Sequence, residues 1–182
     1  LESLRTLCDE QENSNTAQVI SALLDRSSAV RDFARWKLKD IKFDIDFRQF
    51  YLEQIGSNKK YFELAAAVSA LGELGVREDS HKVIPLMSNS SSILVQKAVL
   101  RTLARLDAKS YSDLFEQKLQ SGAAGLSRTA ANILQSTEYS ITAEELWRIF
   151  TTTKFLHVQC NVLRLLDISS QWDRIAYYLL LA

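Results

Sequence analysis

One leucine position recurs along this chain at an almost constant interval, and this period constrains the fold more than any other feature. The intervals between successive copies are 33, 32, 31 and 32 residues, and the copies are Leu38, Leu71, Leu103, Leu134 and Leu166. The residue four positions earlier is always small or β-branched; these residues are Ala34, Ala67, Val99, Ala130 and Val162. In the first three copies an apolar residue follows three positions later, namely Ile41, Leu74 and Leu106. A period in the low thirties is typical of stacked-repeat proteins, in which each unit buries its apolar face against its neighbours.

Each unit is predicted to be a pair of helices. In the third unit, Val83 to Met87 form a short apolar helix, which the polar run 88–92 ends. From Leu94 to Leu106 apolar residues recur every three or four positions, which indicates a second helix with one wide apolar stripe. The same offset predicts helices at residues 19–24, 30–41, 47–55, 61–74, 111–119, 126–134, 146–150 and 158–166. Gly75 stands where a left-handed residue often ends a helix.

Both ends of the sequence fall partway through this pattern. Leu4 and Leu7 fit the second helix of an earlier unit, and Ile175 to Ala182 fits the first helix of a later one. An end unit of a repeat stack needs a polar outer face, which the run Tyr177 to Leu181 does not supply. We therefore expect the chain to be part of a longer array or to have its C-terminal end covered by another segment. The alternative is a dimer contact at natural ends.

Charge and composition exclude several classes of protein. The 22 basic and 22 acidic residues stay equal in number in each third of the chain, so no segment has the positive excess of a dedicated phosphate-backbone binder. Five glycines and one proline suit helices joined by short turns. Cys8 and Cys160 are expected to be free thiols in a reducing, cytoplasmic compartment. No apolar run reaches the ~18–20 residues that span a bilayer, so we expect membrane contact only through segments outside this sequence.

Two stretches resemble HEAT-like repeats. Residues 29–38, Ala-Val-Arg-Asp-Phe-Ala-Arg-Trp-Lys-Leu, are similar to the second-helix signature of these repeats. Residues 67–75, Ala-Val-Ser-Ala-Leu-Gly-Glu-Leu-Gly, resemble the ending of the short bacterial form known as PBS-lyase HEAT-like repeats. The resemblance implies an all-α fold, a right-handed α-solenoid of about five helical hairpins with partial repeats at both ends. It further implies one domain over residues 1–182 and a bacterial source.

The resemblance also implies a ladder of hydrogen bonds between repeats. The family's pair of Asp before the second helix and Arg within it survives once, as Asp25 and Arg31. Elsewhere the pair is degenerate, as in Asn89 with Gln96, and we interpret such pairs as structural bonds that polar substitutes partly replace. HEAT-like repeats serve many unrelated roles, so the resemblance specifies a fold and not an activity.

Enzymes of this repeat class need residues that can be sought in the sequence. Deoxyhypusine hydroxylases hold iron with His-Glu pairs, but neither His81 nor His157 has an adjacent carboxylate, so no metal site is predicted. Bilin lyases handle a tetrapyrrole attached to cysteine; Cys160 would be the contact, although we favour a half-exposed structural thiol. No nucleophile-base set or phosphate-binding glycine loop is found. We predict no catalytic residues, no cofactor and no enzymatic activity, with a bilin-lyase-like enzyme or accessory as the alternative.

Nucleic-acid binding is the second alternative. HEAT-like DNA glycosylases use aromatic, acidic and basic residues of the concave face around a flipped-out base. Trp36, Asp32 and Arg35 imitate part of that set. The balanced charge disfavours this interpretation.

The period sorts the outward residues of the second helices into columns, and the resemblance implies that these helices line the concave surface. One column reads Asp32, Ala65, Lys97, Arg128, Cys160; the next reads Trp36, Ser69, Arg101, Asn132, Arg164; the third reads Asp40, Glu73, Arg105, Ser136, Ile168. The first two units are acidic or neutral here, and the last three are basic. The basic residues are Lys97, Arg101, Arg105, Arg128 and Arg164. They predict a trough for an acidic peptide or helix, because arginine pairs bidentately with carboxylates; solvated side chains whose stems cover apolar surface are the alternative.

Trp36 is the single large aromatic residue in these columns and a further candidate for contacting a partner. Buried packing against Phe33 or a neighbouring helix is the interpretation that we favour for it. Taken together, the sequence predicts a non-enzymatic scaffold for protein–protein interaction. Its partner would be a protein or peptide held on the concave face.

Overall fold

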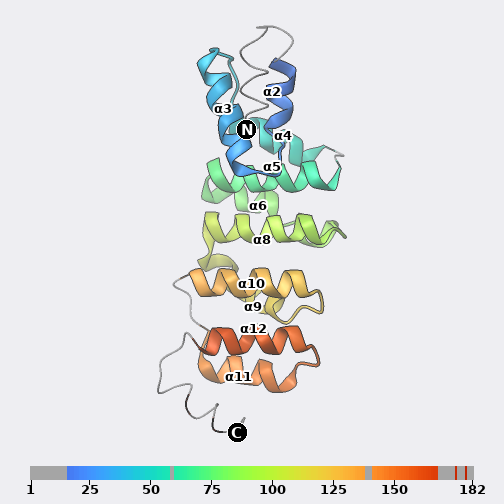
Figure 1. The fold of residues 1–182 in the computed structure, drawn as a ribbon, viewed down its shortest axis with the longest axis vertical. Helices are drawn as coiled ribbons and strands as arrows, with labels where there is room; N and C mark the ends of the chain where they lie inside the picture. The colour runs from blue at the N-terminus through green and yellow to red at the C-terminus, as the bar shows by residue number, and fades with distance from the viewer. Residues whose placement is uncertain (1–15, 58–59, 138–140, 168–174, 176–178, 180–182) are drawn as a thin grey trace. The chain divides into compact units, whose positions relative to one another are not determined.

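The computed structural model describes residues 16–57, 60–137, 141–167, 175 and 179. All regular secondary structure in this described part is helical, which confirms the all-α prediction (Figure 1). The helix expected around Leu4 and Leu7 lies outside the described residues, as do Cys8 and Ile168. Of the helix expected from Ile175 to Ala182, only Ile175 and Leu179 are described, and both are helical and exposed.

The chain divides into two compact units, Leu1–Thr102 and Leu103–Ala182, and the division falls within a helix. The first unit contains α2 (Thr16–Ala22), α3 (Ser28–Asp40), α4 (Phe47–Gly56), α5 (Tyr61–Leu74), η1 (Arg77–Asp79), α6 (Ser80–Val83), α7 (Leu86–Asn89) and most of α8 (Ile93–Asp107). The second contains the end of α8, η2 (Lys109–Tyr111), α9 (Ser112–Leu119), α10 (Ala124–Ser136), α11 (Ala143–Thr152) and α12 (Leu156–Leu166).

The recurring positions of the sequence form the core of both units. All five recurring leucines are buried, and so are the five small or β-branched residues that precede them by four positions. Spacing of four places both residues of each pair on one helix face, which is the face that packs inward. The third apolar position is not part of this core, because Ile41 and Leu74 are 44% and 40% exposed at the ends of α3 and α5.

Four pairs of described helices contact each other as the repeat predicts. Within the first unit α2 contacts α3 and α4 contacts α5; within the second α9 contacts α10 and α11 contacts α12. The second helices of neighbouring pairs also touch, and Figure 1 shows α5 beside α8 and α10 beside α12. Thr102 Oγ1 on α8 donates to the Val68 carbonyl on α5 at 2.8 Å, and Asn161 Nδ2 on α12 donates to Ser127 Oγ on α10 at 2.8 Å. The partners are 34 residues apart in both bonds, close to the sequence period.

Two local predictions are wrong. The single helix from Val83 to Met87 is two four-residue helices, α6 and α7, because Pro85 has no amide hydrogen with which to continue a helix. Gly75 does not adopt a left-handed conformation; its φ and ψ are −73° and 172°. Glycine is needed there for space, since a Cβ would lie 2.5 Å from the Leu71 carbonyl oxygen and 2.9 Å from Asp79 Oδ2.

Candidate functional site

Three of the predicted binding residues lie in one line on α8. Lys97, Arg101 and Arg105 are spaced by four, so their side chains follow each other along one face of the helix. Arg101 and Arg105 are exposed, and Lys97 is partly exposed. Within the described residues none of the three forms an ion pair with a carboxylate. Their charges therefore face solvent without a partner from the described part of the chain.

The other two predicted basic residues lie in the second unit. Arg128 is exposed on α10 and makes no ion pair with a described carboxylate. Arg164 on α12 forms a hydrogen bond within the second unit: its Nη2 donates to Asn132 Oδ1 on α10 at 2.8 Å. A continuous trough over all five residues would join both units and stays a prediction.

Trp36 is more exposed than in the interpretation favoured from the sequence. Its ring does approach Phe33, with 5.6 Å between the ring centroids, but 57% of Trp36 is exposed. The prediction of a buried tryptophan is therefore wrong. Trp36 lies on α3 beside Arg35, which is buried.

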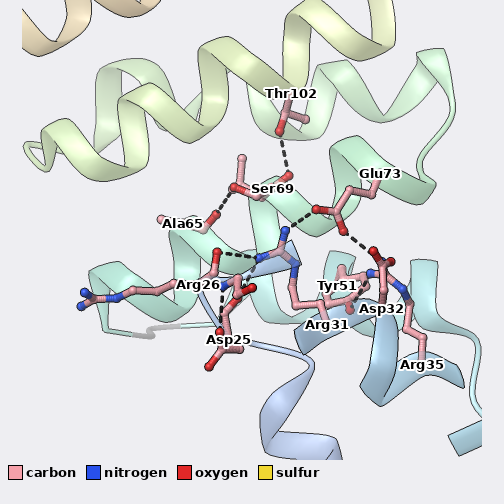
Figure 2. A network of polar contacts seen from close by, with 12 residues as sticks. Asp25, Arg26, Arg31, Asp32, Arg35, Tyr51, Ala65, Ser69, Glu73 and Thr102 are labelled. Carbon is pink, nitrogen blue, oxygen red and sulfur yellow. Dashed lines mark hydrogen bonds and ion pairs between the residues drawn. The ribbon is translucent and has the colours of Figure 1, made fainter. Parts of the chain in front are cut away.

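A buried arginine cluster on α3, α4 and α5 is the most prominent polar feature that the sequence did not predict (Figure 2). It consists of Arg31, Asp32, Arg35, Tyr51 and Glu73. Arg31 and Arg35 are only 2% and 7% exposed, yet both bind the same carboxylate, Glu73. Arg35 Nη2 lies 3.0 Å from Glu73 Oε2 and also pairs with Asp32, while its Nη1 donates to Tyr51 Oη at 3.2 Å.

The cluster shifts the pKa values of Arg35 and Tyr51. Burial alone would lower the Arg35 pKa, but hydrogen bonds with Glu73, Asp32 and Tyr51 outweigh it and hold the pKa above its ordinary value. Burial raises the pKa of Tyr51 more than the neighbouring arginines lower it. Arg35 is therefore a permanent cation next to a neutral phenol. Because Arg35 is buried and both of its terminal nitrogens bond to these partners, it is poorly placed to serve a DNA base as the glycosylase alternative requires.

The cluster also explains where the column alignment fails. Arg31 and Arg35 are 42 and 38 residues from Glu73, whereas the bonds between later second helices span 34 residues or fewer in the pairs described above. In Figure 1, α3 runs across α5 rather than beside it. Glu73, placed by the period in a column with Asp40, therefore faces two arginines of α3. The register expected from the period holds between α5 and α8 and between α10 and α12, but not for α3. Ala65, which the columns place outward on α5, is buried.

The hydrogen bonds of Asp25 and Arg31 also differ from the predicted ladder between repeats. Asp25 accepts the amide of Ser27 at 2.7 Å with its carboxylate, and Arg31 Nη1 donates to the backbone carbonyl of Asp25 at 2.7 Å. Gln96 occupies the equivalent position on α8 and donates to the carbonyl of Ser90 at 2.8 Å. Glutamine does replace arginine, as expected. The bond it makes, however, holds the turn of its own hairpin rather than linking two repeats.

A second ion pair joins α4 to the turn after α5. Arg48 Nε and Nη2 donate to the two carboxylate oxygens of Asp79 at 2.8 and 2.5 Å, and the Val76 amide donates to Asp79 Oδ2 at 3.0 Å. Asp79 is 3% exposed. Burial raises its pKa, but the hydrogen bonds from Arg48 and Val76 and the charge of Arg48 outweigh burial and lower the pKa below its ordinary value.

We expect this pair to make the stability of the first unit depend on pH. Because the folded-state pKa of Asp79 is lowered, its contribution is complete above the unfolded-state pKa near ~3.9 and is lost as pH falls through the lower folded value. Asp79→Asn should reduce the urea midpoint at pH 7 and flatten its decline between about pH 5 and 3. Asp44→Asn, at an exposed residue, is the control. Equal pH profiles of Asp79→Asn and the wild type would contradict this assignment.

A cavity of about 610 Å³ lies between α2, α4 and the start of α5. Ile20, Leu24, Phe50 and Phe62 supply apolar walls, and Glu63 supplies a carboxylate. None of the predicted binding residues lines it.

Within the described residues, no three His, Cys, Asp or Glu side chains come together in a way that could hold a metal ion. Cys160 is exposed on α12. None of the described helices combines the length and hydropathy needed to cross a membrane.

Comparisons with protein-family models, with curated proteins and with solved structures found no match to this chain. A function therefore has to be inferred from the residues of the chain itself.

Proposed function

We propose that the chain is a HEAT-like repeat array, wound as a right-handed α-solenoid, that binds an acidic peptide or helix without catalysing a reaction. The buried recurring positions support the repeat, and so do the hydrogen bonds that join consecutive second helices at intervals of 34 residues. Each repeat then presents one face of its second helix outward. A row of such faces is a surface on which an extended partner can lie.

The line of basic residues on α8 carries the proposal. Lys97, Arg101 and Arg105 stand four residues apart, or about 6 Å along the helix, and have no carboxylate partner within the described residues. By contrast, Arg31, Arg35 and Arg148 each form an ion pair with a carboxylate. Carboxylates of a partner would gain charge-assisted hydrogen bonds here without breaking existing ones.

Charge reversal on α8 tests the proposal. We expect Arg101→Glu with Arg105→Glu to weaken binding of a fluorescein-labelled helical peptide rich in glutamate by more than tenfold. Binding is read from fluorescence anisotropy, and wild-type affinity should fall as salt rises.

The matched control reverses two charges away from α8. Lys82 and Lys154 are exposed, on α6 and in the turn before α12, and Lys82→Glu with Lys154→Glu makes the same change in net charge. This variant should bind within about twofold of wild type, since neither lysine belongs to the basic line on α8 and charge effects without direct contact are screened by salt. An equal loss in both variants would point to net charge alone and would refute a site on α8.

A further inference from the structure

Large apolar side chains stand exposed at the first turns of the second helices. Tyr61 on α5 is 58% exposed, and Ile93 and Leu94 on α8 are 47% and 45% exposed. Tyr61 and Ile93 are 32 residues apart and hold the same position in consecutive repeats. We call these three residues the apolar edge. Leu156 has the equivalent position on α12 in the second unit and is 74% exposed.

The three residues of the apolar edge lie at the same end of two adjacent helices. The bond from Thr102 to the Val68 carbonyl fixes the register of α8 against α5. Tyr61 precedes Val68 by seven residues and Leu94 precedes Thr102 by eight. Because α5 and α8 run side by side in the same direction (Figure 1), both positions are about 10–12 Å from this bond towards the N-terminal ends.

The apolar edge leads directly into the basic line. Ile93, Lys97 and Arg101 follow each other at intervals of four on α8, so one helix face is apolar in its first turn and cationic in the next two. On α5 the equivalent face continues from Tyr61 to Ala65, which is buried, and Ser69, which is partly exposed; neither carries a charge. The one acidic residue that follows on this face, Glu73, is neutralised by Arg31 and Arg35.

We propose that the partner is an amphipathic acidic helix whose apolar residue rests on the apolar edge while its carboxylates pair with Lys97 and Arg101. This inference rests on the function proposed above and specifies its partner. A partner helix lying along α8 has the same rise of about 1.5 Å per residue. An apolar residue with glutamates four and eight positions away therefore meets Ile93, Lys97 and Arg101 in turn. A purely acidic segment would leave the apolar edge in water.

Two labelled peptides test the inference. The first is a helical peptide with one leucine and glutamates four and eight positions away on both sides, so that it can lie in either direction along α8. The second has alanine in place of the leucine. We expect the wild-type chain to bind the leucine peptide about tenfold more tightly, because the leucine side chain is buried on the apolar edge.

Ile93→Ser with Leu94→Ser should abolish this preference and leave the affinity for the alanine peptide unchanged. The control, Leu156→Ser, removes an equally placed leucine on α12, where Cys160 follows instead of a cation; it should keep the preference. Circular dichroism confirms that each variant is folded. Equal wild-type affinity for both peptides would overturn this inference and leave the proposed function intact, whereas no binding of either peptide would overturn both. Binding to anionic lipid vesicles that is lost in Ile93→Ser with Leu94→Ser, without peptide discrimination, would instead assign the edge to a membrane.

Discussion

Replacing Glu73 with alanine is expected to lower the free energy of unfolding by roughly 3–5 kcal/mol. Glu73 is the carboxylate shared by Arg31 and Arg35, whose side chains are only 3% and 8% exposed. Without it, Arg31 keeps hydrogen bonds to the carbonyls of Asp25 and Arg26 but loses its counter-charge. A buried cation without a counter-charge is far more costly than an absent ion pair, because water cannot reach it.

The measurement is urea unfolding followed by circular dichroism at pH 7. Glu53→Ala makes the same substitution at an exposed position of α4 and should change stability by no more than about 0.5 kcal/mol. A second variant separates charge from packing: replacing Arg31, Arg35 and Glu73 together by leucine or methionine should recover most of the lost stability, since apolar residues of similar volume often replace a buried ionic triad without penalty. A loss in Glu73→Ala as small as that of Glu53→Ala would show that the cluster contributes little.

Gly72→Ala is expected to destabilise the first unit by about 1–2 kcal/mol, although alanine is the better helix former. A Cβ at Gly72 would lie 2.8 Å from Thr102 Oγ1 and 3.1 Å from Thr102 Cα. Thr102 cannot turn away without losing its bond to the Val68 carbonyl. Overpacking of this kind costs about 1–3 kcal/mol, which exceeds the gain of up to about 1 kcal/mol from helix propensity.

A second glycine provides the control for this prediction. A Cβ at Gly56, the last residue of α4, would meet nothing within 4 Å. Gly56→Ala should therefore be neutral or stabilise by up to about 1 kcal/mol, chiefly by restricting the unfolded chain. Thr102→Ala removes the nearest atom, so the cost of Gly72→Ala should shrink in that background. Stabilisation by Gly72→Ala in the wild-type background would show that α5 and α8 approach less closely than described.

The sequence predicts the core of this fold well and its polar contacts poorly. The five recurring leucines mark buried positions, because a helix that buries one face needs apolar residues at a regular spacing. Such a spacing can be read directly from the sequence. The helix at residues 61–74 was predicted with its observed bounds for the same reason. The break between α6 and α7 could have been predicted from Pro85, since proline lacks the amide hydrogen that a helix interior requires.

The candidate site was predicted in part. The line on α8 follows from spacing within one helix, so Lys97, Arg101 and Arg105 lie where the sequence places them. The arginine cluster could not be predicted, because it depends on how α3 crosses α5. An arginine in a helix is ordinarily predicted to lie on the surface. The spacing of residues within a helix also gives no indication that Glu73 pairs with arginines 38 and 42 residues away.

The two kinds of joint between second helices differ in how freely repeats can be exchanged. Between α5 and α8 the joint needs only a glycine and a threonine that bonds to a backbone carbonyl, which any helix supplies. A duplicated or transplanted repeat could meet that requirement with little change to its neighbour. Between α3 and α5 the joint requires two arginines on one side and a glutamate on the other, and loss of one member leaves a buried charge. A substitution on one side of the α3–α5 joint therefore has to be matched on the other side, whereas α8 bonds to the α5 backbone, which side-chain substitutions on α5 leave in place.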